Sequence, residues 1–388
     1  MLKALTLGWA IIYAGRTCLY PLLSVIADKL SLTSAQAGAL TSTYFIMYVL
    51  MQIPGGIIGD RVGLKKVLML MYTVAALGLL GLGLYGTNYK TLLLFTALHG
   101  FGAGGYYPTA YGTMLQVVEA AQRGFSSAVI GIGMAVGLLL GLAVSGPVYE
   151  IMDSFQAPFI IMSVPTFAIM ICFYLALPDI RGGGQASWQK YKAILLDKDL
   201  WLINISTFMA LYGFWVAISW GPTFLKIERN FSLGQAGLYT GLMAITAVPG
   251  GLVWGRLSDR FGRKRIAQII LPLGGISLFL LSRATTPGVI IGILLLFGLF
   301  SNSAYTPVMV ALTGDIVGRR YPGNLGAATG IFNCTIMCSA IIAPVVSGYL
   351  RDMTGSLTVA IMVGSLVMLA GTLLIFLLPD LNTRLQHG

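Results

Sequence analysis

The chain is built from long apolar runs of about 20 residues or more, separated by short stretches that contain charge, glycine and proline. A run of that length matches the roughly 20 residues that an α-helix needs to cross the hydrocarbon core of a bilayer. The pattern therefore predicts an all-α membrane protein with twelve transmembrane helices. They are expected at residues 5–27, 34–58, 66–86, 91–116, 124–148, 157–177, 200–225, 234–256, 265–284, 288–313, 324–349 and 356–378.

Composition agrees with this pattern and removes most other classes of protein. The 388 residues are 57% hydrophobic and only 10% charged, against roughly 25% charged in soluble proteins, and the mean hydropathy is +0.84. A water-soluble enzyme and a disordered chain are both excluded. The four cysteines lie in apolar runs, and Cys334 and Cys338 lack nearby histidine or carboxylate partners, so we expect no disulfide framework, no metal and no cofactor.

The net charge of +11 reflects membrane topology and not a nucleic-acid surface. Twelve spans place both termini on one side, where the ends and loops carry seventeen of the 24 Lys and Arg residues, against six on the other side. Basic residues accumulate in cytoplasmic loops. We therefore expect both termini in the cytoplasm, in a bacterial-type inner membrane.

The longest connector divides the spans six and six. It contains three consecutive glycines followed by a charged stretch, and no segment is large enough for a separate soluble domain. We expect an N-terminal six-helix bundle at 1–178, a cytoplasmic linker at 179–199 and a C-terminal six-helix bundle at 200–388.

The two halves repeat each other at an offset of 199 residues. Between residues 36 and 67, 11 of 32 positions are identical to their mates in the second half, and later Tyr106 and Pro108 align with Tyr305 and Pro307. Parallel repeats in transporters are related by an axis along the membrane normal, with the substrate site between them. The repeat therefore predicts two pseudo-symmetric bundles.

A glycine-bounded, charged loop occurs once in each half. The stretches from Gly56 to Lys66 and from Gly255 to Arg265 resemble the loop motif of the major facilitator superfamily, and the resemblance covers the whole chain. It implies a secondary transporter that works by alternating access, and not an enzyme. A carboxylate in such a loop can bind a helix N-terminus or an arginine and lock a gate. The candidate gating residues are Asp60, Arg61, Asp259 and Arg260.

The twenty-fourth basic residue, Arg16, lies at the midpoint of the first span, about 16 Å from either end at the helical rise. A charge at that depth is costly and marks a functional site by default. None of the thirteen acidic residues lies in the middle of a span. A permanent cation there favours an anionic ligand, because guanidinium binds carboxylate or phosphate with two hydrogen bonds.

Residues in the first two predicted spans restrict the resemblance to one branch of the superfamily. Arg16 together with residues 32–38 and 48–56 resembles the anion:cation symporter branch, whose members carry organic anions. The resemblance implies a small organic anion, carboxylate in type, as the substrate, with Tyr13, Arg16, Tyr48 and Asn333 lining its site. Further candidates for contact with the substrate are Tyr20, Tyr107, Trp215 and Asn302.

The chain departs from that branch where the branch carries ionisable residues. Gly15, Thr96 and Ala103 replace an acidic residue, an arginine and a glutamate. His99 is the titratable group nearest to these positions and a candidate proton or substrate group. We therefore expect an exchanger or a uniporter, or coupling to another cation, unless His99 or the substrate carries the proton.

Two alternative transport functions stay open at this point. Efflux of amphipathic drugs would require buried carboxylates for cationic compounds, and the spans lack them. Organic phosphate exchangers tend to carry a second arginine where this chain has Trp215. Neither terminus carries a signalling domain that would favour a membrane sensor. We expect a monomer in the lipid bilayer, with a small organic anion as its ligand and no nucleic-acid partner.

Overall fold

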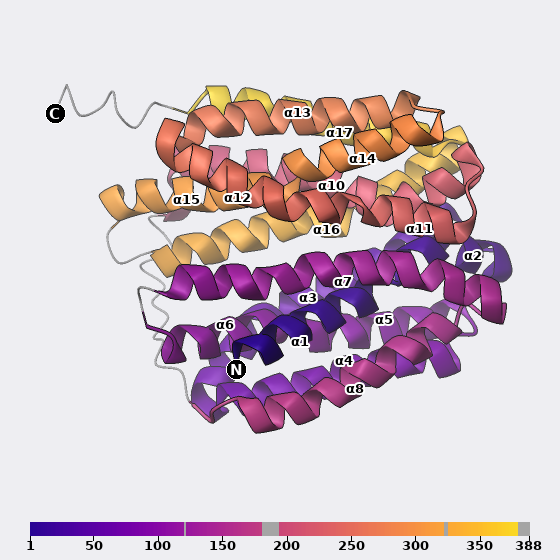
Figure 1. Cartoon of the computed structure of the whole chain (residues 1–388), viewed down its shortest axis with the longest axis horizontal. Helices are drawn as coiled ribbons and strands as arrows, with labels where there is room; N and C mark the ends of the chain where they lie inside the picture. Colours follow the sequence, from indigo (N-terminus) through magenta and orange to yellow (C-terminus); the bar gives the residue numbers. More distant parts are fainter. Residues whose placement is uncertain (120–121, 181–193, 322–324, 379–388) are drawn as a thin grey trace. The chain divides into compact units, whose positions relative to one another are not determined.

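The computed structural model describes residues 1–119, 122–180, 194–321 and 325–378, and its long elements are α-helices (Figure 1). The predicted linker therefore lies partly outside the described residues. The helices of the first half are α1 (Leu2–Thr17), α2 (Leu19–Leu30), α3 (Ser34–Val62), α4 (Leu64–Tyr85), α5 (Tyr89–Gly104), α6 (Tyr106–Val117), α7 (Arg123–Met152) and α8 (Ala157–Ala176). Those of the second half are α10 (Lys198–Arg229), α11 (Leu233–Gly241), α12 (Met243–Phe261), α13 (Arg263–Arg283), α14 (Pro287–Phe300), α15 (Asn302–Arg320), α16 (Leu325–Thr354) and α17 (Leu357–Phe376).

The helices group into two compact units. The first unit comprises Met1–Gln185 and Ser219–Gly241, and the second comprises Ala186–Ile218 and Leu242–Gly388. Helix α10 thus begins in the second unit and ends in the first, and α11 packs with the first unit on α7. The predicted division into bundles at 1–178 and 200–388 follows the chain and stays a prediction.

The prediction that the apolar runs form transmembrane helices is confirmed. Among the described residues, eleven helical stretches are long and apolar enough to cross a membrane, and α5 with α6 covers the remaining predicted span. The repeat also appears in the residues at which the helices begin and end. Helix α3 begins at Ser34 and ends at Val62, whereas α11 begins at Leu233 and α12 ends at Phe261. Both pairs of ends keep the offset of 199 residues.

In the part of the chain that the structure describes, four of the spans are interrupted, which the apolar pattern does not predict. The interruptions fall at Cys18, Gly105, Leu242 and Ser301. Pro21 and Pro108 each follow a break by three residues. Proline has no N–H to donate to the carbonyl four residues earlier and its ring collides with that carbonyl, so the turn before it is weakened. The first interruption places Arg16 in the last turn of α1.

Helix α1 is held by a glycine face on α7. A Cβ atom built on Gly133, Gly137 or Gly141 would lie within 2.2 Å of atoms of α1, so the two helices approach almost backbone to backbone. Thr17 donates from Oγ1 to the carbonyl oxygen of Gly137 at 3.4 Å. Small residues at a spacing of four permit this approach in membranes, where close packing and interhelical hydrogen bonds drive association.

The described residues at the two ends of the linker form hydrogen bonds with helices α4 and α15. Before it, the Leu64 N–H donates to the Ile180 carbonyl at 2.9 Å in the first unit. After it, Arg320 at the end of α15 donates to Asp197 at 2.8 Å and to Asp199 at 2.6 Å in the second unit. The two carboxylate side chains are only 4% and 2% exposed. An arginine shared by two buried carboxylates is a strong, charge-assisted contact.

We expect Gly137→Ala to lower the free energy of unfolding by about 1–3 kcal/mol, because its Cβ would lie 2.1 Å from the Ala10 carbonyl oxygen and overpack the helix interface. Thermal unfolding in detergent measures the effect. The matched control is Gly131→Ala on the same helix, where the new Cβ has no neighbour within 4 Å. Since alanine favours a helix over glycine, that control should keep or raise stability. Equal losses in both variants would contradict the packing account.

Asp197 should make the free energy of unfolding decrease at acidic pH. Burial acts to raise the pKa of its carboxyl, but hydrogen bonds from Arg320, the Leu200 N–H and Tyr321 hold that pKa below its usual value. A lowered native pKa adds stability above the unfolded value of about 3.9, and this stability is lost as the pH falls through the native value. We expect Asp197→Asn to unfold at a lower temperature than wild type at pH 7, with the difference shrinking below about pH 4. A pH-independent difference would contradict this.

Candidate functional site

Arg16 is almost fully enclosed by protein. Its relative exposure is 5%, and its guanidinium carbon lies 3.7 Å from the centroid of the Tyr13 ring. Tyr13 precedes Arg16 by three residues on α1, and residues at that spacing share a helix face. A guanidinium over an aromatic face is attracted by the ring quadrupole, more strongly once water is excluded.

Helix α3 supplies the next part of the enclosure. The guanidinium carbon of Arg16 lies 5.1 Å from the Phe45 ring centroid and 5.9 Å from that of Tyr44. Tyr48 stacks on Tyr44 with ring centroids 6.0 Å apart and an interplanar angle of 16°. We call Tyr13, Arg16, Tyr44, Phe45 and Tyr48 the arginine cage. Its aromatic members replace part of the hydration that the charge loses.

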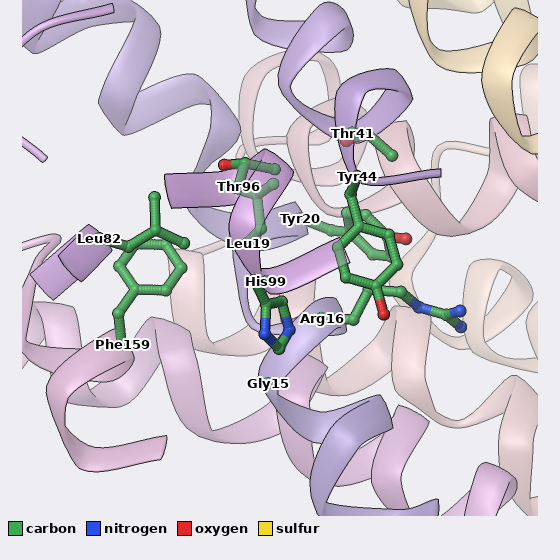
Figure 2. Close-up of a pocket in the computed structure, with 10 residues that line it drawn as sticks. All are labelled: Gly15, Arg16, Leu19, Tyr20, Thr41, Tyr44, Leu82, Thr96, His99 and Phe159. Carbon is green, nitrogen blue, oxygen red and sulfur yellow. The ribbon is translucent and has the colours of Figure 1, made fainter. Parts of the chain in front are cut away.

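Two members of the arginine cage were not predicted from the sequence. Tyr44 and Phe45 are ordinary aromatic residues of an apolar span. Tyr44 lies four residues before Tyr48, and that helical spacing was the available signal. Tyr20, which was predicted, is fully buried on α2 beside the same site. Figure 2 shows Arg16, Tyr20 and Tyr44 side by side.

A small cavity of about 10 Å³ adjoins the arginine cage on the side of α5. His99, 2% exposed, lies on this cavity with its Nδ1 atom 3.0 Å from the Ala75 carbonyl oxygen. Gly15 and Thr96, two of the positions that depart from the resembled branch, line it as well (Figure 2). The complete lining is Gly15, Arg16, Leu19, Tyr20, Thr41, Tyr44, Leu82, Thr96, His99 and Phe159.

Tyr107 lies at the edge of this region. It is 43% exposed, and its ring centroid is 6.2 Å from that of Trp9, which is in turn 4.9 Å from that of Tyr13. Trp9 therefore connects Tyr107 to the arginine cage. Its contact with a ligand stays a prediction.

The remaining substrate candidates belong to the second unit. Trp215 is buried on α10, with 2% exposure. Asn302 is the first residue of α15, after the break at Ser301, and accepts a hydrogen bond from Thr306 at 2.6 Å. Asn333 is half-buried on α16. Their contact with the substrate stays a prediction.

In each charged loop the chain changes direction at a glycine with a positive φ. Gly63 has φ +121° and Gly262 has φ +97°, a region that side chains other than glycine rarely adopt. Arg61 is exposed, and the side chain of Asp60 lies outside the described residues. Among the described parts of the chain no group of three or more His, Cys, Asp or Glu residues could hold a metal ion.

In the second loop the ion pairs centre on Arg263. Arg263 lies 2.8 Å from Asp315 on α15 and 3.7 Å from Asp259 on its own loop. Arg260, which was predicted to gate, lies over the Phe261 ring at 5.3 Å. Arg263 was not among the predicted gating residues, because its partner Asp315 is 52 residues away and no spacing rule links the two.

Comparisons with known proteins identify relatives along nearly the whole chain. The family model of the Major Facilitator Superfamily matches residues 5–245 and again 203–387. A probable sulfoacetate transporter of Cupriavidus necator is 28% identical, over 96% of this chain and 92% of that protein. The voltage-gated purine nucleotide uniporter of Mus musculus is 24% identical, over 91% and 83% of the two chains.

Solved structures share the fold at low identity. A bacterial homologue of the human lysosomal transporter Spinster, in an inward-facing and unoccupied conformation, has a TM-score of 0.77 at 16% identity, and covers 97% of this chain and 94% of that one. The nucleoside transporter NupG has a TM-score of 0.77 at 17% identity, over 97% and 100%. These matches confirm the predicted all-α membrane fold, and the relatives are transporters and not enzymes.

We expect Asp315→Asn to lower thermal stability more than Asp259→Asn. The Arg263–Asp315 contact is the shorter and the less exposed of the two, and exposed ion pairs at longer range contribute little, about 0–1 kcal/mol. Unfolding temperatures of both variants in the same detergent measure this. If Asp259→Asn caused the larger loss, Arg263 would not be anchored mainly through α15.

Proposed function

Since the chain belongs to the Major Facilitator Superfamily, we propose that it moves a small organic anion across the membrane and binds that anion at Arg16. The family membership and the relatives support transport of a small molecule by a multi-pass membrane protein. The choice of an anion comes from one observation, the enclosed guanidinium in the arginine cage.

The chemistry of Arg16 favours a carboxylate or a sulfonate. Guanidinium stays charged at any physiological pH, and its planar fork fits two oxygen atoms of one anionic group. In surroundings of low dielectric constant, an anion that approaches it gains far more electrostatic energy than it would in water.

The relatives support an anion in a second, independent way. One is named for sulfoacetate and another for purine nucleotides, and both ligands are organic anions. Since the purine nucleotides are organic phosphates, the two names together support an anion but not its type. We propose the sulfoacetate type, a small molecule with one or two carboxylate or sulfonate groups. An organic phosphate is the second candidate, but the resemblance counts against it, because organic phosphate exchangers tend to carry a second arginine where this chain has Trp215.

The rest of the transport cycle is part of the same proposal. Two bundles, 1–178 and 200–388, joined by the linker 179–199, would alternate access to Arg16 in an inner membrane with both termini cytoplasmic, in a monomer. The predicted contacts from the second half, Trp215, Asn302 and Asn333, would complete the substrate site. The charged loops that contain Asp60 and Arg61, and Asp259 and Arg260, would act in gating, with Arg263 as the anchor of the second loop.

We expect Arg16→Ala to abolish uptake of radiolabelled sulfoacetate into proteoliposomes, and Arg16→Lys to reduce it strongly. Losing a desolvated Arg–carboxylate contact costs about 2–5 kcal/mol, which corresponds to at least a roughly thirtyfold loss of affinity. Lysine retains the charge but loses the planar fork.

The matched control is Arg283→Lys, since Arg283 lies at the end of α13 and is exposed. It should leave uptake unchanged. A panel of acetate, malonate, sulfoacetate and glycerol 3-phosphate separates carboxylate, sulfonate and phosphate ligands. Uptake that survives Arg16→Ala would overturn the proposed role of Arg16, and uptake of the phosphate alone would replace the proposed ligand class.

A further inference from the structure

The second half of the chain contributes one segment to the first compact unit. Residues Ser219–Gly241 follow the linker, yet they group with Met1–Gln185. They comprise the end of α10, the turn after it and all of α11. Figure 1 shows α11 at the same end of the first unit as α2 and the end of α7, away from the N-terminus. We call Ser219–Gly241 the clasped segment.

Helix α11 lies against α7 with almost no side chain between the two backbones. A Cβ atom on Gly146 of α7 would lie 2.7 Å from the Cα atom of Gly234, and one on Gly237 would lie 2.1 Å from the carbonyl oxygen of Leu142. Small residues allow helices in a membrane to approach this closely. The approach brings the first turn of α11 within reach of side chains on α7.

Glu150 lies about one turn after Gly146 on α7 and bonds this first turn of α11. The Gly234 N–H donates to Glu150 Oε1 at 3.0 Å, and Gly234 is the second residue of α11. The first N–H groups of a helix have no partner within the helix and carry positive partial charge. The carboxylate therefore holds α11 through charge as well as through the hydrogen bond.

The neighbouring groups at the start of α11 are paired within their own segment. The Gln235 N–H donates to Ser232 Oγ at 3.2 Å, and the Ser232 N–H donates to Gln235 Oε1 at 3.2 Å. These reciprocal bonds form a capping box. The box does not use the Gly234 N–H, which bonds the carboxylate of Glu150 on α7 instead.

A lysine holds the other side of the clasped segment. Lys226, in the last turn of α10, donates from Nζ to Ser24 Oγ on α2 at 3.4 Å. Ser24 is 1% exposed and lies one turn after Tyr20, which lines the cavity beside the arginine cage. Lys29 near the end of α2 lies 3.7 Å from Asp153, the residue after α7. The two helices that contact the clasped segment are thus also joined to each other.

We propose that Glu150 and Lys226 form a clasp that holds the clasped segment against the first unit and keeps the transport path closed on the side of the membrane opposite the termini. The inference rests on the proposed function, because it assigns both residues to one step of that transport cycle. Neither residue has to touch the substrate. Both are positioning residues that set the balance between a state with α11 on α7 and a state with the two helices apart.

The contact of Glu150 has the strength that a reversible closure requires. Glu150 is exposed, so water replaces the Gly234 N–H when the helices separate, and the net difference in hydrogen bonding is small. A carboxylate at an exposed helix N-terminus favours the closed contact by a factor of about two to five. Such a factor shifts the populations of the two states and leaves both accessible.

The first test measures the separation of α7 from α11 without any substrate. Spin labels at Ile151→Cys and Leu238→Cys, two exposed positions on these helices, report the distance in the full-length protein in nanodiscs, in a background without the four native cysteines. We expect Glu150→Ala to raise the ratio of long to short distances about two- to fivefold. Glu150→Gln keeps an oxygen acceptor but loses the charge, so its ratio should lie between the two.

The matched control is Asp28→Ala, which removes an exposed carboxylate from α2 near the same end of the first unit. It should leave the ratio unchanged. A ratio that is the same in wild type and in Glu150→Ala, including one below detection in both, would overturn the clasp. So would an equal rise in Asp28→Ala, because the effect would then follow from the loss of any negative charge at this end.

The second contact is tested with Lys226→Met, which keeps most of the length of the side chain and removes the ammonium. The same pair of labels should again show a larger share of long distances. Since Lys226 and Glu150 lie on different helices and bond different partners, the double variant should multiply the two ratios. An unchanged ratio in Lys226→Met would overturn the role assigned to Lys226.

The clasp and the anion site fail in different measurements. The label distances require no ligand, so an unchanged ratio would overturn the clasp while uptake that depends on Arg16 still supported the proposed function. Uptake of sulfoacetate that survives Arg16→Ala would overturn the proposed function, and the distances would still decide the clasp.

Discussion

A guanidinium held in the interior of a membrane protein is the constraint on which the rest of the first unit depends. A charge at this depth is unfavourable by several kcal/mol unless its surroundings replace the lost water. The arginine cage does so in part with the faces of Tyr13, Tyr44 and Phe45. What aromatic rings cannot supply is a full opposite charge, and an anionic ligand can. The same feature thus explains the packing of the cage and the proposed substrate.

Local sequence features determine where Arg16 lies in the first unit. The break at Cys18, three residues before Pro21, ends α1 at Thr17, one residue after Arg16. The glycine face of α7 brings α1 close enough for Thr17 to bond the Gly137 carbonyl, so the helix that carries the charge is fixed against α7. Helix α5 contributes His99, whose ring is fixed by α4. The position of α1, and with it that of Arg16, is therefore set partly by contacts with the backbone of α7.

Much of this was predictable from the sequence, and the exceptions share a cause. The apolar runs and the repeat predicted where the helices lie, because span length and loop position follow from bilayer thickness. The largest difference is at the end of α15, which reaches Arg320 where the predicted span ends at residue 313. Arg16 was identifiable because a charge inside an apolar run is rare. Tyr44, Phe45 and Arg263 were not, since aromatic residues are common in spans and the Arg263–Asp315 contact depends on two helices meeting. The helix breaks at Leu242 and Ser301 likewise depend on tertiary packing that no local pattern records.

The central claim is that the charge of Arg16 recognises the charge of the substrate. The most direct measurement is the affinity of purified protein for sulfoacetate and for the analogue in which a neutral carboxamide replaces its carboxylate, by calorimetry, in wild type and in Arg16→Gln. If Arg16 pairs with the carboxylate, wild type should prefer the acid by at least about 2 kcal/mol, and Arg16→Gln should lose that preference. If sulfoacetate pairs through its sulfonate instead, the analogue modified at the sulfonate will show the loss. An equal preference for the acid in wild type and in Arg16→Gln, with both analogues, would contradict the account.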